Sequence, residues 1–190
     1  MLSFVFLSGC NSGTRKEEAG SVKTDENKRL TDTAHYRKLG DSIVKITFDT
    51  LRNALTSTIA EKGFSEAISF CNVNAYPITA WYAKEGVTIR RTSARFRNPA
   101  NSPDSLEAIW LQNFAVPGTG TAVVPEGGRI HYFKPILLQA MCKNCHGDPS
   151  SDIRPETLAE IRKRYPEDKA TGYQEGEMRG MWHLVFTGKQ

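Results

Sequence analysis

The chain has 190 residues, 39% of them hydrophobic, which is the size of one domain with a single core. Its 25 Lys and Arg are spread among 21 Asp and Glu, so the net charge is only +4 and no basic helix or nucleic-acid fold signature is present. Nucleic acid is therefore not expected as a partner.

The N-terminal residues 1–10 form a short apolar run that ends in Leu-Ser-Gly-Cys, after which the sequence becomes polar. This pattern resembles a bacterial lipoprotein signal. It predicts lipidation of Cys10 and a lipid-anchored place on the periplasmic side of a bacterial membrane. The run is shorter than the roughly 20 apolar residues that span a bilayer, and it lacks the basic segment of a signal peptide. The alternatives are a truncated start, or a chance resemblance that leaves Cys10 as an exposed thiol.

Residues 11–32 are rich in Gly, Ser, Lys, Glu, Asp and Asn and have almost no apolar side chains. Such a composition cannot bury enough surface to offset the entropy of ordering the backbone. We expect a flexible tether here, followed by one folded domain over residues 33–190.

Two helices are expected at the start of this domain. Apolar residues at three- and four-residue spacings predict a long amphipathic helix over residues 33–62 that ends at Gly63. A second helix is expected to begin at Ser65, with Pro77 kinking or interrupting it. Cys71 lies on the apolar face of this second helix and is expected to point into the core.

Strand and helix patterns are interspersed in the rest of the chain. Strands are expected over residues 87–93, 119–124, 129–138 and 179–186, and the middle two form a hairpin. One helix is expected after a cap at Asn101 or Ser102, with Pro103 in its first turn, and another over residues 155–165. The buried face of the first of these is predicted to be Leu106, Ile109, Trp110 and Phe114. This order of elements predicts an α+β fold with an antiparallel sheet.

A C-x-x-C-H motif occupies residues 142–146. Two cysteines three apart on one helical turn can each add across a haem vinyl group, and the histidine after them can ligate the iron. The motif predicts one covalent c-type haem, attached through Cys142 and Cys145 and ligated by His146. A zinc site would need two more ligands, and the chain has no second C-x-x-C; a thioredoxin-type dithiol would need a βαβ unit around it.

Cys71 has no role once the motif cysteines and Cys10 are assigned. Such a thiol is buried and inert, reactive, or a metal ligand. The other candidates for a second iron ligand are Met178, Met181, His131 and His183.

Arginines are expected to bind the two haem propionates. A planar guanidinium group matches a carboxylate with paired hydrogen bonds. Arg95 and Arg97 are the candidates, with Arg91 behind them; the alternative is that these arginines only solvate a loop.

Five stretches of the sequence together carry a family pattern. They are Phe70-Cys71-Asn72, residues 91–93 and 97–104 with Glu107, Lys134-Pro135-Ile136, residues 142–147, and residues 165–173 with Gly176, Arg179 and Gly180. The combination resembles the Tll0287-like haem domain family over about residues 35–187. The resemblance implies a PAS-like α+β domain with long N-terminal helices. It also implies a c-type haem whose iron lies between His146 and the thiolate of Cys71.

A thiolate ligand favours ferric over ferrous iron, so a low reduction potential is expected. The expected function is electron transfer or redox sensing outside the cytoplasm, with an unidentified redox partner protein. Two axial ligands occupy both faces of the iron, which argues against an enzyme. The alternatives are a peroxidase-like haem enzyme, and a gas sensor in which Cys71 leaves the reduced iron and opens a site for carbon monoxide or nitric oxide. A homodimer through the first helix is a further expectation without residue-level support.

Overall fold

The computed structural model describes residues 32–81, 83 and 86–187 of the chain. The predicted lipidation site Cys10 and the tether up to residue 31 lie outside the described residues. Within the part of the chain that is described, no helix has the length and apolar character needed to cross a membrane.

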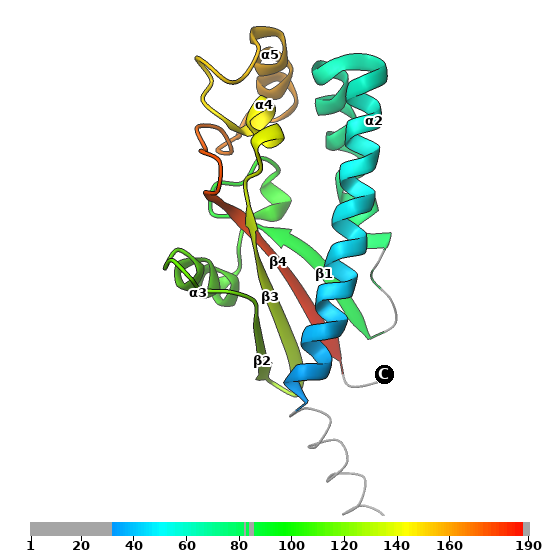
Figure 1. The fold of residues 1–190 in the computed structure, drawn as a ribbon, viewed down its shortest axis with the longest axis vertical. Helices are drawn as coiled ribbons and strands as arrows, with labels where there is room; N and C mark the ends of the chain where they lie inside the picture. Colours follow the sequence, from blue (N-terminus) through cyan, green and yellow to red (C-terminus); the bar gives the residue numbers. More distant parts are fainter. Residues whose placement is uncertain (1–31, 82, 84–85, 188–190) are drawn as a thin grey trace, which may run out of the picture.

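A four-stranded sheet forms the centre of the fold, as Figure 1 shows. Its strands are β1 (Val87–Thr92), β2 (Ala122–Glu126), β3 (Arg129–Leu137) and β4 (Met178–Thr187), in the order β1-β4-β3-β2. All three pairings are antiparallel. The predicted hairpin is present, and its turn consists of Gly127 and Gly128, with φ of 58° and 73°. Two consecutive residues with positive φ form the tight turn that suits the twist of a hairpin. The expected α+β class with an antiparallel sheet is confirmed.

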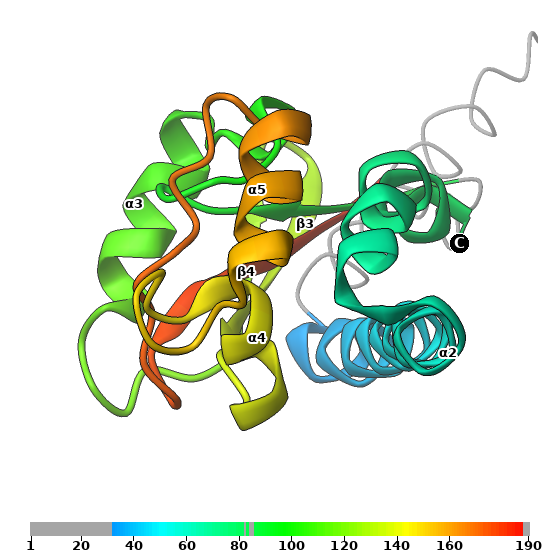
Figure 2. The ribbon, with the colours of Figure 1, turned by 90° about the horizontal axis from the view of Figure 1, so that it is seen from above.

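The long element α2 (Thr33–Trp81) is two helices joined at a break. Gly63 has φ 83° and ψ 178°, values that glycine adopts without strain, and the chain folds back there so that the two halves lie side by side (Figures 1 and 2). The predicted pair of helices is confirmed. Pro77 was expected to kink or to interrupt the second helix, and the interruption is wrong, because Gly63 has the only non-helical dihedral angles in α2. Pro77 removes the amide that would bond to the carbonyl of Val73, and Val73 is 64% exposed, on the side of the helix that faces water.

The helix α3 (Ser105–Phe114) begins later than its predicted caps. Asp104 is the N-cap; its Oδ1 accepts from the amide of Glu107 at 2.8 Å, and Glu107 Oε2 accepts from the amide of Asp104 at 3.0 Å. This reciprocal pair satisfies two amide donors that the helix itself leaves free. Asn101 belongs to a preceding 3-10 turn, η1 (Pro99–Asn101). Ile109 is 55% exposed, so its assignment to the buried face is also wrong.

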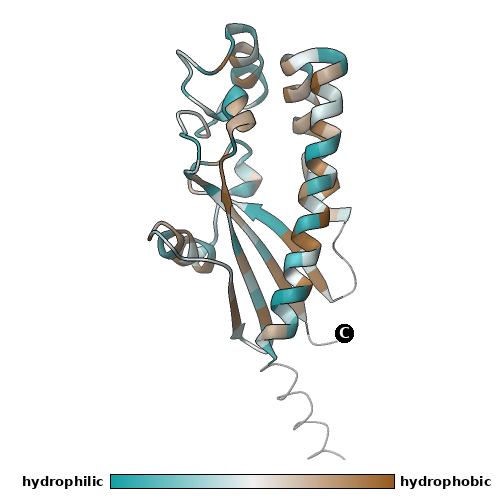
Figure 3. Cartoon of the chain, in the orientation of Figure 1, coloured by the Kyte–Doolittle hydropathy of each residue, from teal (hydrophilic) through white to brown (hydrophobic). Residues whose placement is uncertain are grey.

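Helices cover both faces of the sheet. The first half of α2 packs on one face, in a cluster that includes Val44, Tyr132 and Leu184, while α3 packs on the other through Leu111 and Phe114. Figure 3 shows apolar segments interspersed with polar ones along α2 and along the strands of the sheet. The helix α5 (Pro155–Arg164) packs against the second half of α2 in a separate cluster that joins Ile68, Ile153, Ile161 and Tyr165.

The C-x-x-C-H motif lies at one end of the sheet. β3 leads through η2 (Ala140–Cys142) directly into the short helical turn α4 (Lys143–His146). Because β1 and β3 both run antiparallel to β4, the ends of β1 and β3 meet the start of β4 at this edge, with Thr92 opposite Met181 and Leu137 opposite Met178. The motif therefore faces the ends of three strands and the folded-back half of α2 (Figure 1).

Candidate cofactor site

A large cavity lies between α2, the end of the sheet and α4. Its empty space amounts to about 1080 Å³, a figure that includes open solvent at its mouth. One wall is apolar and comes from Leu51, Leu55 and Ile59 in the first half of α2. All three residues of the predicted haem motif, Cys142, Cys145 and His146, also line the cavity.

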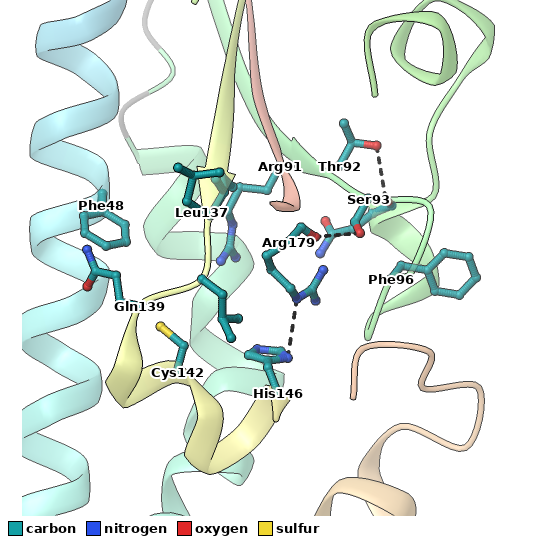
Figure 4. Close-up of a pocket in the computed structure, with 13 residues that line it drawn as sticks. Phe48, Arg91, Thr92, Ser93, Phe96, Leu137, Gln139, Cys142, His146 and Arg179 are labelled. Carbon is teal, nitrogen blue, oxygen red and sulfur yellow. Dashed lines mark hydrogen bonds between the residues drawn. The ribbon is translucent and has the colours of Figure 1, made fainter. Parts of the chain in front are cut away.

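A second hollow of about 740 Å³ adjoins the first on the side of the sheet. Arg91, Cys142, His146 and Arg179 line both. In Figure 4 the two arginine side chains extend from the strand ends towards the space into which Cys142, at the end of η2, and His146, in α4, point. Cationic groups and potential metal or thioether ligands therefore face one another across a shared space.

His146 is held with one ring nitrogen occupied and the other free. Its Nδ1 lies 2.7 Å from the carbonyl oxygen of Ala170. Since a carbonyl only accepts, Nδ1 carries the proton, and the 3.4 Å approach of Arg179 Nε to the same nitrogen is a contact between two donors (Figure 4). Burial, followed by the charges of Arg97 and Arg179, lowers the pKa of His146 well below its usual 6.5. The ring is neutral, and Nε2 offers an unprotonated lone pair for a metal ion.

The backbone around the motif is tied to the loop after α5. The amides of Gly172 and Tyr173 donate to the carbonyls of Gly147 and His146, at 2.7 and 2.9 Å. Gly147 leaves no room for a side chain, because a Cβ there would lie 2.6 Å from Asp152 Oδ2. The glycine that follows the motif is therefore required by close packing, and both sides of α4 are held in place.

Both motif cysteines are half-buried free thiols. Burial raises the pKa of Cys145 to about 11, so its sulfur is protonated at neutral pH. In the described part of the chain, no group of three or more His, Cys, Asp and Glu side chains is arranged to hold a metal ion.

Cys71 lines the same cavity as His146. Burial raises the pKa of its thiol, and the charges of Arg91 and Arg97 oppose that rise. The other four candidates for a second ligand lie elsewhere: Met178 and Met181 pack against α3, and His131 Nδ1 lies 3.0 Å from His183 Nε2. Among the five candidates, Cys71 is the one that shares a cavity with His146.

The predicted propionate ligands Arg95 and Arg97 are both engaged by the protein itself. Arg95 lies outside the large cavity, where it pairs with Glu177 at 3.2 Å. Arg97 lines the cavity, but its guanidinium binds Asp168, with Nε 3.1 Å from Oδ1. Neither arginine presents a free guanidinium group to the cavity.

Arg91 and Arg179 line both hollows and lack an anionic partner. Within the described residues, neither has a carboxylate within 4.0 Å. Arg91 Nε is buried without any hydrogen-bond partner. Burial lowers the pKa of both groups, that of Arg179 to about 10. Two guanidinium groups without an ion-pair partner, beside a cavity with an apolar wall, match a ligand that is largely apolar and carries carboxylates.

Comparison with known proteins identifies the family. A family model described as Tll0287-like matches residues 21–186. The chain belongs to the Tll0287-like family. The crystal structure of a cyanobacterial haem protein, Tll0287, matches with a TM-score of 0.55 and 27% sequence identity, over 93% of this chain and 99% of that chain. A search of the curated proteins finds no match.

The membership in the Tll0287-like family that the sequence predicted is thus confirmed. Arg179 lines both hollows of this Tll0287-like domain, although it was not among the site residues predicted from the sequence. Its signal is positional: Arg179 stands at the start of the last strand, and that strand begins beside the end of β1, which carries Arg91. Only the pairing of β1 with β4 brings these two arginines together.

Proposed function

We propose that this Tll0287-like protein is a c-type haem protein that transfers electrons or senses redox state outside the cytoplasm. Cys142 and Cys145 would form the thioether bonds, and His146 and Cys71 would ligate the iron. When bound, the haem supplies a one-electron Fe(III)/Fe(II) couple. The proposed location is the periplasmic side of a bacterial membrane, with Cys10 as the lipid anchor and another redox protein as the partner.

The observation that carries the proposal is the state of His146. Its neutral ring donates Nδ1–H to Ala170 and presents Nε2 in a cavity lined by both motif cysteines. A backbone acceptor on the second nitrogen fixes the tautomer and orientation of a metal-binding histidine and makes it a stronger donor. The tautomer and the two nearby thiols are what covalent haem attachment at a C-x-x-C-H motif requires.

The remaining groups match other parts of a haem. The apolar side chains of α2 exclude water from a flat ring, and Arg91 and Arg179 supply positive charge for two propionates. Cys71 as a thiolate would favour ferric iron and give a low potential. Its raised thiol pKa means that the charge of the metal would have to keep the sulfur deprotonated.

The test is to express the full chain with haem-maturation machinery and to compare the wild type with Cys71→Ala. Haem that remains attached after acid–acetone extraction would support thioether bonds at Cys142 and Cys145. A low-spin thiolate signal in the electron paramagnetic resonance spectrum of ferric wild type, lost in Cys71→Ala, would support the ligand pair. Extractable haem, or no haem, would overturn the c-type assignment, and an unchanged spectrum would remove Cys71 from the iron. Rapid peroxide-dependent oxidation of a donor dye would instead support a haem enzyme.

A further inference from the structure

One buried ion pair joins two loops beside the motif. Arg97 follows β1 and Asp168 follows α5, and both side chains are 9% exposed. The guanidinium binds the carboxylate at two points, with Nε 3.1 Å from Oδ1 and Nη2 3.2 Å from Oδ2. A paired contact of this kind fixes the orientation of both groups.

The same pair holds the backbone around the hydrogen bond of His146. Arg97 Nη2 donates to the carbonyl of Cys145 at 2.6 Å and lies 3.4 Å from the carbonyl of Ala170. Asp168 Oδ1 accepts from the amide of Ala170 at 3.0 Å. Ala170 is the residue whose carbonyl accepts from His146 Nδ1. The pair thus contacts a motif cysteine and the group that orients the histidine ring.

We propose that Arg97 and Asp168 are positioning residues that act on the His146 imidazole through Ala170 and set the reduction potential of the centre. This role presupposes the haem ligation proposed above. It differs from the propionate binding expected for Arg97, because the guanidinium is turned to Asp168 and the backbone.

The two charges act in opposite directions. Ferric iron carries one more positive charge than ferrous iron, so a nearby guanidinium favours the reduced state. Arg97 also draws electron density from the carbonyl of Ala170 and weakens its pull on Nδ1–H, which makes His146 a poorer donor to ferric iron. The carboxylate of Asp168 opposes both effects. Loss of the Arg97 charge should therefore lower the potential, and loss of the Asp168 charge should raise it.

The experiment is a spectroelectrochemical titration of the full chain, matured with haem, as wild type, Arg97→Gln and Asp168→Asn. We expect the Fe(II)/Fe(III) ratio at a fixed potential to fall in Arg97→Gln and to rise in Asp168→Asn. A change of about tenfold corresponds to about 59 mV for this one-electron couple. Arg97→Lys keeps the positive charge, so its reduction potential should lie closer to that of the wild type than to that of Arg97→Gln.

Arg95 and Glu177 provide the matched control. This pair joins the same two loops at 3.2 Å but is 42% and 41% exposed, so Arg95→Gln and Glu177→Gln should leave the potential unchanged. A purely structural role would shift Arg97→Gln and Asp168→Asn in the same direction; that result, or no shift beyond the controls, would overturn the proposal. If Arg97→Gln does not bind haem, the isosteric Asp168→Asn is sufficient as a test. A reduction potential in Asp168→Asn that is lower than that of the wild type, or equal to it, would overturn the proposal. Absence of attached haem in the wild type would refute the proposed function instead.

Discussion

Replacing Arg91 by methionine is expected to change the stability of the haem-free and haem-bound chains in opposite directions. Arg91 Nε is buried without a partner, and Nη2 donates to the carbonyl of Ala75 at 3.2 Å. Burying an ion costs several kcal/mol, and replacing buried charged groups by apolar side chains of similar volume gains roughly 1–4 kcal/mol. Losing the hydrogen bond and the contact with the Trp182 ring, 5.7 Å away, costs about 1–2 kcal/mol together. The haem-free chain should therefore gain about 1 kcal/mol.

In the haem-bound chain the same substitution removes one member of a proposed ion pair with a propionate. Breaking a buried pair costs about 3–5 kcal/mol, so the net change should be a loss of stability. Guanidinium chloride unfolding, followed by circular dichroism, measures both forms; the haem-free form is made without maturation machinery. Arg52→Met is the control, because Arg52 is 43% exposed and pairs with Asp49 on the surface. Equal destabilisation of both forms by Arg91→Met would refute the reasoning and make Arg91 an ordinary structural residue.

Three further predictions concern the surroundings of the site. Gly147→Ala should lower the amount of attached haem, measured as haemochrome absorbance per mole of protein, because the new Cβ would lie 2.6 Å from Asp152 Oδ2. Wild-type haem content in this variant would contradict the prediction and show that the loop moves to accommodate the Cβ. Glu107→Gln should lower the free energy of unfolding by about 1–3 kcal/mol, because a fully buried carboxylate accepts from His183 Nδ1 at 2.8 Å, and an unchanged denaturation midpoint would contradict this. Burial and the neighbouring His183 lower the pKa of His131 below 6.5, so the folded state binds fewer protons and stability should fall as the pH drops below 6.5. Denaturation midpoints across this range should fall less in His131→Gln than in the wild type, and identical slopes would contradict the prediction.

Features that depend on nearby residues could be predicted well from the sequence. The helix break at Gly63 and the turn at Gly127 and Gly128 need backbone conformations that glycine adopts most easily, so the residue type marks the place. The spacing of apolar residues also predicted the α+β class, because helices and strands bury one face at different sequence periods. The start of α3 was misplaced because several residues suited to capping occur between Asn98 and Asp104. Which of them caps α3 is decided by Glu107, whose side chain completes the reciprocal bonds with Asp104.

The sequence by itself determined the chemistry available at residues 142–146 and left Cys71 without another role. The tertiary structure alone decided which groups surround them. Arg97 is 71 residues from Asp168, and Arg91 meets Arg179 only because β1 pairs with β4. A motif is read from neighbours along the chain, whereas the charge balance and the burial of a site depend on neighbours in space. For that reason the motif could be identified from the sequence, whereas the contacts of the arginines could be identified only from the tertiary structure.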